Sequence, residues 1–218
     1  MKKKITRDDI LSRSITHEEF KNLSDEFKKD REIVLLAVKS DGYAFEYADD
    51  SFKKDREFIL EAVNSSNAGV LQYADESFRK DREIVLTAVK SDGFALQYAD
   101  ESFRKDREIV LSAVERQGYA LKYADDSFKK DRAIVLVAVQ TDGLNAIGYV
   151  DESFKKDREI MLAAVKSRGG ALRFAHKSLK MDRSFVLEAV QCSFDAIYNV
   201  HKSFKKDREI VLAAVKSN

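Results

Sequence analysis

Three histidines and one cysteine are the side chains of this chain best suited to nucleophilic or metal chemistry. His176, Cys192 and His201 lie near one another in the sequence, an arrangement that could hold a metal ion if their side chains converged. No Ser–His or Cys–His arrangement typical of nucleophilic catalysis stands out, and no glycine-rich loop offers a phosphate site. The serines fall where helix caps and turns are expected. These residues favour a chain that is not an enzyme.

The composition narrows the class further. The 218 residues include no proline, no tryptophan and one cysteine, with 35% charged and 44% apolar residues, which excludes disulfide scaffolds, Pro-rich linkers and low-complexity disorder. Lys and Arg total 39 against 38 Asp and Glu, so no global field attracts nucleic acid or anionic lipid. No apolar run approaches the roughly 18 residues of a membrane span. We therefore expect no membrane partner and a cytoplasmic protein, with which the single Cys192 is compatible.

An Asp-Arg pair recurs along the chain at a nearly constant interval. The spacings are 25, 26, 25, 25, 26, 25 and 25 residues, and similar sequence surrounds each pair. The pairs begin at Asp30, Asp55, Asp81, Asp106, Asp131, Asp157, Asp182 and Asp207. A fixed period of this kind is typical of a solenoid. We predict a tandem array over 30–218, with its last repeat cut short after the first helix, and a divergent N-terminal half-repeat or cap over 1–29.

Each repeat predicts two helices. After Asp30, the apolar Ile33, Val34 and Val38 recur at helical spacing, with Asp30 as N-cap and Gly42 as a left-handed stop. We call this first helix, of about 10–12 residues, helix A. A shorter helix B is predicted over 43–48, and 49–54 forms a turn into the next repeat. Since two short helices cannot bury their own apolar faces, neighbouring repeats must stack, which predicts an all-α solenoid of about eight 25-residue two-helix repeats.

The stacking of neighbouring repeats makes a metal site at His176, Cys192 and His201 unfavourable. Equivalent positions of neighbouring repeats, such as His176 and His201, should lie about one helix spacing apart, roughly 8–10 Å. That is too far for shared ligands near 2.1 Å unless the side chains converge. We predict no metal and no cofactor.

The repeated motif Asp-Arg-Glu-Ile-Val-Leu-x-Ala-Val-Lys-Ser-Asp-Gly-Tyr-Ala-Leu-x-Tyr-Ala resembles the tandem-repeat family catalogued as domain of unknown function 4116. The resemblance covers nearly all of the chain beyond residue 29. It implies helical repeats and no particular chemistry. Two repeats depart from the pattern by one inserted residue, at Asn64–Gly69 and at Leu144–Asn145, and Phe194 replaces the expected glycine in the seventh.

Arginine recurs in the first turn of every helix A, where the helix dipole disfavours it, so we expect it to pair with a carboxylate. The acidic pairs of the turns, such as Asp75-Glu76, are the predicted partners. One aromatic position also recurs, and we interpret it as a core ladder, with a platform for stacking bases as the alternative. That ladder is Tyr47, Tyr73, Tyr98, Tyr123, Tyr149 and Phe174.

Variation between repeats indicates where a protein partner would bind. The exposed face of helix A is apolar in the fifth repeat, at Ala133 and Val137, with small Ser112 and Ala163 in the repeats on either side. The irregular Leu144-Asn145 lies in that same repeat. We predict a protein-binding patch from these residues.

A Lys/Arg edge supports a second interpretation, in which the chain binds nucleic acid through phosphate contacts. In the C-terminal part, His176-Lys177 and His201-Lys202 replace the acidic pair and reverse the local charge. The predicted phosphate-binding residues are Lys54, Lys80, Lys105, Lys130, Lys156, Lys177, Lys202 and Lys206.

The last helix, unlike a polar cap, keeps the apolar pattern of an internal repeat at Ile210, Val211, Leu212 and Val215. Either the array continues beyond this sequence, or this end contacts another molecule, as in an end-to-end homodimer. Taken together, these patterns predict a non-catalytic binding module or scaffold for a protein partner. Nucleic-acid binding and a purely structural spacer remain the alternatives, and the salt dependence of binding separates the first two.

Overall fold

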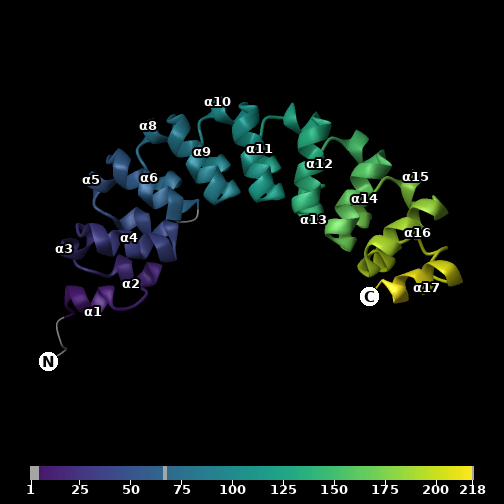
Figure 1. Ribbon diagram of the computed structural model, residues 1–218, viewed down its shortest axis with the longest axis horizontal. Coiled ribbons are helices and arrows are strands. Elements are labelled where there is room, and N and C mark those ends of the chain that lie inside the picture. The colour runs from purple at the N-terminus through teal and green to yellow at the C-terminus, as the bar shows by residue number, and fades with distance from the viewer. Residues whose placement is uncertain (1–4, 66–67, 218) are drawn as a thin grey trace. The chain divides into compact units, whose positions relative to one another are not determined.

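The computed structural model describes residues 5–65 and 68–217, and within these ranges the secondary structure is helical throughout (Figure 1). The fold is the predicted all-α repeat solenoid. Two compact units, 1–116 and 117–218, are treated separately below. The helices A are α4 (Arg31–Ser40), α6 (Arg56–Ser65), α9 (Arg82–Ser91) and α11 (Arg107–Arg116) in the first unit, and α12 (Arg132–Thr141), α14 (Arg158–Ser167), α16 (Arg183–Cys192) and α17 (Arg208–Lys216) in the second.

Helix A begins as the sequence predicts. Asp30 caps α4, its Oδ1 accepting the backbone N–H groups of Glu32 at 3.0 Å and Ile33 at 3.2 Å. Ile33, Val34 and Val38 are fully buried. Because this spacing turns most of the helix surface inward, each helix A is stabilised chiefly by its neighbours.

The prediction that glycine ends helix A in a left-handed conformation is wrong. No glycine of the described residues has a positive φ, and Asp41, which ends α4, is extended at φ −152°. The glycines are needed for close packing instead. A Cβ on Gly118 would lie 2.1 Å from the carbonyl oxygen of Ala138, and one on Gly143 would lie 2.2 Å from that of Ala164. Glycine therefore lets helix B pack directly on the backbone of the next helix A.

Helix B forms in each of the first seven repeats, but most copies are 3₁₀ rather than α-helical. The 3₁₀ copies are η1 (Gly42–Tyr47), η2 (Gly93–Tyr98), η3 (Gly118–Tyr123), η6 (Gly169–Phe174) and η7 (Phe194–Asn199). The two α-helical copies, α7 (Gly69–Tyr73) and α13 (Gly143–Ala146), belong to the two repeats with an inserted residue. A 3₁₀ helix rises about 2.0 Å per residue against 1.5 Å for an α-helix, so the wider winding takes up the extra residue. Part of the first insertion, at 66–67, lies outside the described residues.

The predicted turn before most helices A is itself helical, which adds a third element to the two expected, whereas residues 202–206 before α17 form a turn. These linker helices are α5 (Asp50–Lys53), α8 (Glu76–Arg79), α10 (Glu101–Arg104), η4 (Phe128–Lys130), η5 (Glu152–Lys156) and α15 (Lys177–Lys180). Asp75 caps α8 by accepting from Ser77 N at 3.0 Å and Ser77 Oγ at 2.7 Å. The Asp75 N–H also donates to Lys53 O at 3.0 Å, which ties one linker to the preceding one.

The N-terminal segment packs onto the first repeat. It contains α1 (Arg7–Leu11), α2 (His17–Lys21) and α3 (Asp25–Lys28), and Thr6 and Thr16 form capping boxes at the first two. Ile10, Ile15 and Phe20 are buried, and α1 contacts α4 while α2 contacts η1.

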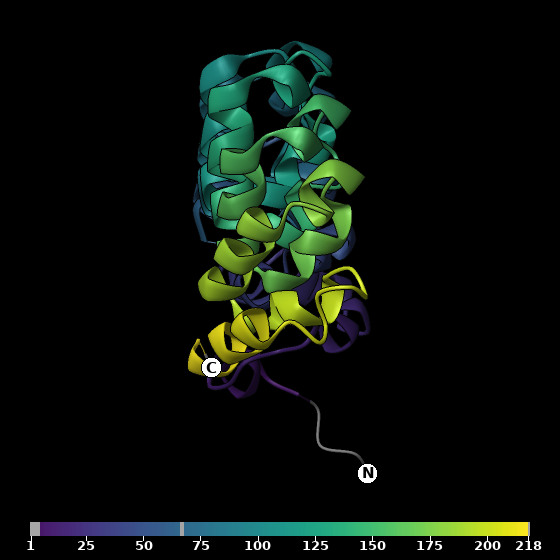
Figure 2. The ribbon, with the colours of Figure 1, turned by 90° about the vertical axis from the view of Figure 1, so that its right-hand side faces the viewer.

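Within each unit the repeats stack in rows. In the second unit α12, α14, α16 and α17 follow one another, and η3, α13, η6 and η7 form a neighbouring row, which we call the helix B layer (Figures 1 and 2). In the second unit each helix A also contacts the helix B of the repeat before it. No helix of the described residues is both long and apolar enough to cross a membrane.

Candidate protein-binding surface

The first-turn arginines pair between repeats, but with different partners from those predicted. Arg56 reaches Asp81 at 3.0 Å and Glu83 at 2.5 Å, which are the N-cap and first-turn residues of the next helix A. Arg183 pairs in the same way with Asp207 at 2.8 Å and Glu209 at 2.7 Å. The acidic pairs of the linkers cannot serve, because their first member is already used to cap the linker helix. The hydrogen bond from Arg183 holds the pKa of Asp207 below its usual value.

Two repeats use a second version of this ladder. Arg31 pairs with Glu61 at 2.7 Å and Arg158 with Glu188 at 2.6 Å, one helical turn further along the next helix A. In both cases a phenylalanine replaces the usual isoleucine of the next helix A, and the guanidinium lies 5.5 Å from the ring centroid of Phe58 or Phe185. The aromatic ring and the shifted glutamate therefore occur together.

The helix A face carries apolar grooves between neighbouring helices. One groove, of about 450 Å³, crosses α12, α14 and α16, with Leu136, Leu162 and Ala163 among its apolar lining residues. Gln140 and Lys166 line it as well, and the ion pair of Arg158 and Glu188 closes one side. The leucine at this position of helix A is half-buried in six helices, from Leu60 of α6 to Leu187 of α16.

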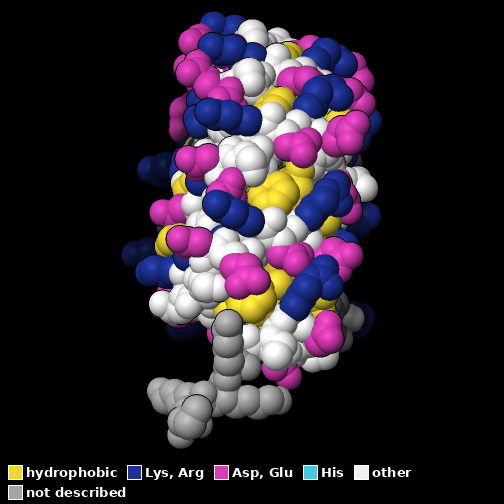
Figure 3. Space-filling model, turned by 90° about the vertical axis from the view of Figure 1, so that its left-hand side faces the viewer, with side chains coloured by type: hydrophobic (Ala, Val, Ile, Leu, Met, Phe, Trp, Pro, Cys, Tyr) yellow, Lys and Arg dark blue, Asp and Glu magenta, His cyan; other side chains and the backbone are white. Residues whose placement is uncertain are grey.

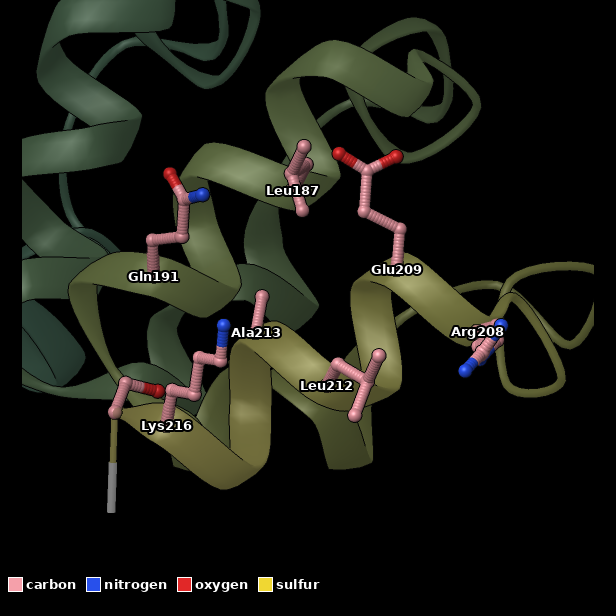
Figure 4. Close-up of a pocket in the computed structure, with 8 residues that line it drawn as sticks. Leu187, Gln191, Arg208, Glu209, Leu212, Ala213 and Lys216 are labelled. Atoms are coloured by element: carbon pink, nitrogen blue, oxygen red, sulfur yellow. The ribbon is translucent and has the colours of Figure 1, made fainter.

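A second groove, of about 620 Å³, lies between α16 and α17 (Figure 4). Leu187 comes from α16, and Leu212 and Ala213 come from α17. Leu212 is 46% exposed although it occupies the position of the half-buried Leu187 and Leu162. Glu209 and Lys216 lie toward opposite ends of the groove, so its apolar part has a charge of each sign beside it.

The structure distributes the predicted patch over different surfaces. Ala133 is exposed at the start of α12, and Val137 and Ala163 are half-buried on α12 and α14, all on the helix A face. Leu144 and the exposed Asn145 belong to α13 in the helix B layer, where Leu144 Cδ1 lies 3.4 Å from the Cβ position of Gly170. Ser112, half-buried on α11, belongs to the other unit.

Four of the predicted phosphate-binding lysines, three in the first unit and Lys130 in the second, lie near carboxylates. Lys80 pairs with Glu76 at 2.7 Å and Lys105 with Glu101 at 2.6 Å. Lys54 is close enough to Asp75 to help lower its pKa, after the hydrogen bonds from Ser77, and Lys130 does the same for Asp151 after those from Ser153. On the face drawn in Figure 3, basic and acidic side chains alternate around apolar ones.

The remaining predicted lysines lie at the C-terminal linkers. Lys156, Lys177, Lys202 and Lys206 are exposed. Among the described residues, no carboxylate lies within ion-pair distance of them. They are the part of the predicted basic edge that carries uncompensated charge.

The two histidines of this edge cap the segments that follow them, which are α15 after His176 and a turn after His201. His176 Nδ1 lies 3.2 Å from the backbone N of Ser178, and His201 Nδ1 lies 3.3 Å from that of Ser203, as the cap aspartates do elsewhere. A ring nitrogen that accepts a backbone N–H places the proton of a neutral ring on Nε2. Over residues 5–65 and 68–217 no three His, Cys, Asp or Glu side chains lie close enough to hold a metal ion.

The aromatic ladder is half-buried, and two of its hydroxyls contact tyrosines outside the ladder. Tyr43 OH lies 3.4 Å from Tyr98 OH, and Tyr149 OH donates to Tyr119 OH at 3.2 Å. Tyr149 of the ladder packs edge-to-face on Tyr119, with ring centroids 5.3 Å apart, an arrangement common among buried aromatic rings. Tyr119 is outside the predicted ladder, and the sequence analysis missed its contacts.

At the last helix, the apolar residues differ in exposure. Ile210 is buried, whereas Val211, Leu212 and Val215 are 37%, 46% and 69% exposed. The end-to-end contact through these residues stays a prediction.

Comparisons with curated proteins and with solved structures gave no match to this chain. The family model described as domain of unknown function 4116 matches it six times in tandem, over residues 15–53, 30–67, 55–104, 106–155, 138–180 and 182–218. These matches follow the stacked helices A, their helices B and the linkers almost from end to end. The chain belongs to the family described as domain of unknown function 4116.

Proposed function

We propose that this protein is a non-catalytic binding module that recognises a protein partner through the helix A face of its second unit. The observation that supports this most is the pair of grooves on that face. Both are lined by apolar side chains with charged or amide groups beside them, as in many protein interfaces, where an apolar centre has a polar rim.

In this proposal the partner places apolar side chains between successive leucines. Leu136 and Leu162 would contact one such side chain, and Leu187 and Leu212 another. The ion pairs beside the grooves, such as Arg158 with Glu188, keep neighbouring helices A in register and so fix the groove spacing. Rim charges of this kind set orientation and association rate more than affinity.

The charge pattern supports a protein partner over nucleic acid. Phosphate contacts need cations without competing carboxylates, and on the first unit Lys80 and Lys105 are already paired. The overall charge of +1 points the same way. The C-terminal lysines are the exception and make the salt dependence of binding a necessary measurement.

The test is capture of partners from the native host's lysate with nuclease, at low and high salt, read by mass spectrometry. Ala163→Arg fills the α14 groove without removing a core side chain. Thr87→Arg is the matched control, because Thr87 is the equivalent half-buried position on α9 of the first unit. A protein partner that survives high salt, is lost with Ala163→Arg and is retained with Thr87→Arg supports the proposal.

Three outcomes would count against it. Nucleic acid that is lost at high salt would favour the nucleic-acid interpretation. A partner that binds both variants equally would show that the grooves are not part of its binding site. Capture of nothing above background would favour a structural spacer.

A further inference from the structure

We propose that the helix B layer of the second unit carries a second interaction surface, which binds an acidic segment of a protein between Lys122 and Arg173. This surface shares no residue with the helix A grooves and so goes beyond the function proposed above.

Lys122 is held by tyrosines rather than by a carboxylate. Its Nζ donates to Tyr119 OH at 3.1 Å and lies 5.3, 5.4 and 5.8 Å from the ring centroids of Tyr119, Tyr123 and Tyr149. Each of these is a cation–π distance. The side chain is exposed, and in the part of the chain that the structure describes no carboxylate pairs with it. Its charge is therefore positioned and available to a ligand.

Arg173 is positioned in a similar way on η6. Its guanidinium carbon lies 4.7 Å from the ring centroid of Phe174, and the side chain is exposed. Again no acidic side chain of the described residues lies at ion-pair distance. A planar guanidinium stacked on a ring keeps its donors free for a carboxylate.

The two cations occupy the same position of their repeats, directly before the ladder aromatic. In the repeat between them that position is Gly148, which is exposed. A Cβ there would meet only Asn145 O, at 3.5 Å, so packing does not demand a glycine as it does at Gly143. In the helix B layer, α13 contacts both η3 and η6. The surface between Lys122 and Arg173 therefore has no side chain at the equivalent position of the repeat between them.

The spacing favours an acidic protein segment over a nucleic acid. Neighbouring helices pack about 8–10 Å apart, so two steps along the layer separate the cations by roughly 16–20 Å. An extended peptide covers that distance in about five to six residues and can place a carboxylate at each end. A nucleic-acid strand has a phosphate about every 3.4 Å of helix axis and would leave most of them unpaired.

The aromatic rings also favour an acidic protein segment over a nucleic acid. Lys122 and Arg173 lie over the ring faces that a base would need for stacking. At the equivalent helix B positions the first unit has no cation, because these residues are Glu46, Gln72 and Gln97. The surface is thus a local property of the second unit.

The test uses the full chain and fluorescein-labelled peptides of Ser, Gly and Asn with two glutamates five, six or seven residues apart, followed by fluorescence anisotropy at low salt. We expect the best-spaced peptide to bind and its Glu→Gln version to bind at least fivefold more weakly. Lys122→Met and Arg173→Met should each weaken binding at least fivefold. Lys90→Met removes an exposed lysine of the first unit and should leave the affinity unchanged.

Far-UV circular dichroism establishes that each variant is folded. Ala163→Arg, which fills the helix A groove, should not alter peptide binding, so failure of the proposed function and failure of this inference are separable. Equal binding of the Glu and Gln peptides would overturn the inference, as would full affinity in both methionine variants. A single-stranded oligonucleotide could also bind more tightly than the best peptide and lose this binding in Lys122→Met and Arg173→Met. That result would overturn the inference and assign the surface to nucleic acid.

Discussion

Arg158 donates to the Glu188 carboxylate at 2.6 Å, one turn beyond the position of the partner that Arg183 uses in the following repeat. The shift coincides with Phe185, over whose ring Arg158 lies at 5.5 Å, and with Ser184, which stands where six of the other repeats have a glutamate. Two different sets of residues therefore link successive helices A by ion pairs.

The first prediction is that replacing Ser184, Phe185 and Glu188 by the common residues costs less stability when all three are changed together than the single changes cost in sum. Phe185→Ile leaves a smaller core side chain, and Glu188→Ala removes the carboxylate, so each should destabilise the chain. Adding Ser184→Glu to both restores the common pattern and should recover part of the lost stability, because residues in one network are not additive. Chemical denaturation of the singles and the triple variant measures this. A triple variant that loses the sum of its parts would contradict the exchange.

The glycines offer a paired prediction. Gly143→Ala would drive a methyl group into the Ala164 carbonyl, 2.2 Å away, and overpacking against backbone should cost about 1–3 kcal/mol. Gly148→Ala meets its nearest neighbour at 3.5 Å with no positive φ to relieve. It should be neutral or stabilise by about 0.4–1 kcal/mol, since alanine restricts the unfolded chain. Thermal or urea unfolding measures both, and equal losses would show that the close approach is not what demands glycine.

Much of the fold could be predicted because the same N-cap and the same spacing of apolar residues occur in each of the eight repeats. The Asp30 cap and the buried Ile33 and Val34 follow from helical spacing alone. The glycine interpretation failed because Gly42 in sequence looks the same whether it supplies a left-handed φ or room for a neighbour. Only the packing partner, on the next helix A, distinguishes the two.

The candidate sites were harder to predict, because they depend on which layer a residue occupies. Val137 and Leu144 are seven residues apart, yet they lie on the helix A face and in the helix B layer. The Lys122 cluster joins residues of two repeats, Tyr119 and Tyr149, that no periodicity links. The one available signal was a lysine where the first unit has Glu46, Gln72 and Gln97.

Acid should destabilise the chain through its N-cap aspartates. The hydrogen bond from Arg183 lowers the folded-state pKa of Asp207, and that from Arg7 lowers the pKa of Asp30. A carboxyl whose folded pKa is below its unfolded value, about 3.9, stabilises the fold above that pH and loses this contribution as the pH falls further. Asparagine caps a helix about as well but does not titrate there. Asp207→Asn should therefore lower the Tm at pH 7, with a difference from wild type that shrinks toward pH 3. A difference that grows in acid would contradict the assignment.

The last prediction concerns Tyr119, whose oxygen accepts hydrogen bonds from both Tyr149 and Lys122. Both bonds stabilise the phenolate, so the pKa of Tyr119 lies below the usual tyrosine value, while donation to Tyr119 raises the pKa of Tyr149. Tyr149→Phe removes the first donor and Lys122→Met removes the second together with its charge, so each should raise the pKa of Tyr119. ¹³C NMR of Cζ-labelled tyrosine, assigned with Tyr119→Phe, follows the titration. Tyr43→Phe is the control, because its hydroxyl contacts Tyr98 in the first unit and its loss should leave Tyr119 unchanged. If Tyr119 titrates alike in wild type and Lys122→Met, the ammonium does not rest on its hydroxyl, and Lys122 is not held in the position that the acidic-segment surface requires.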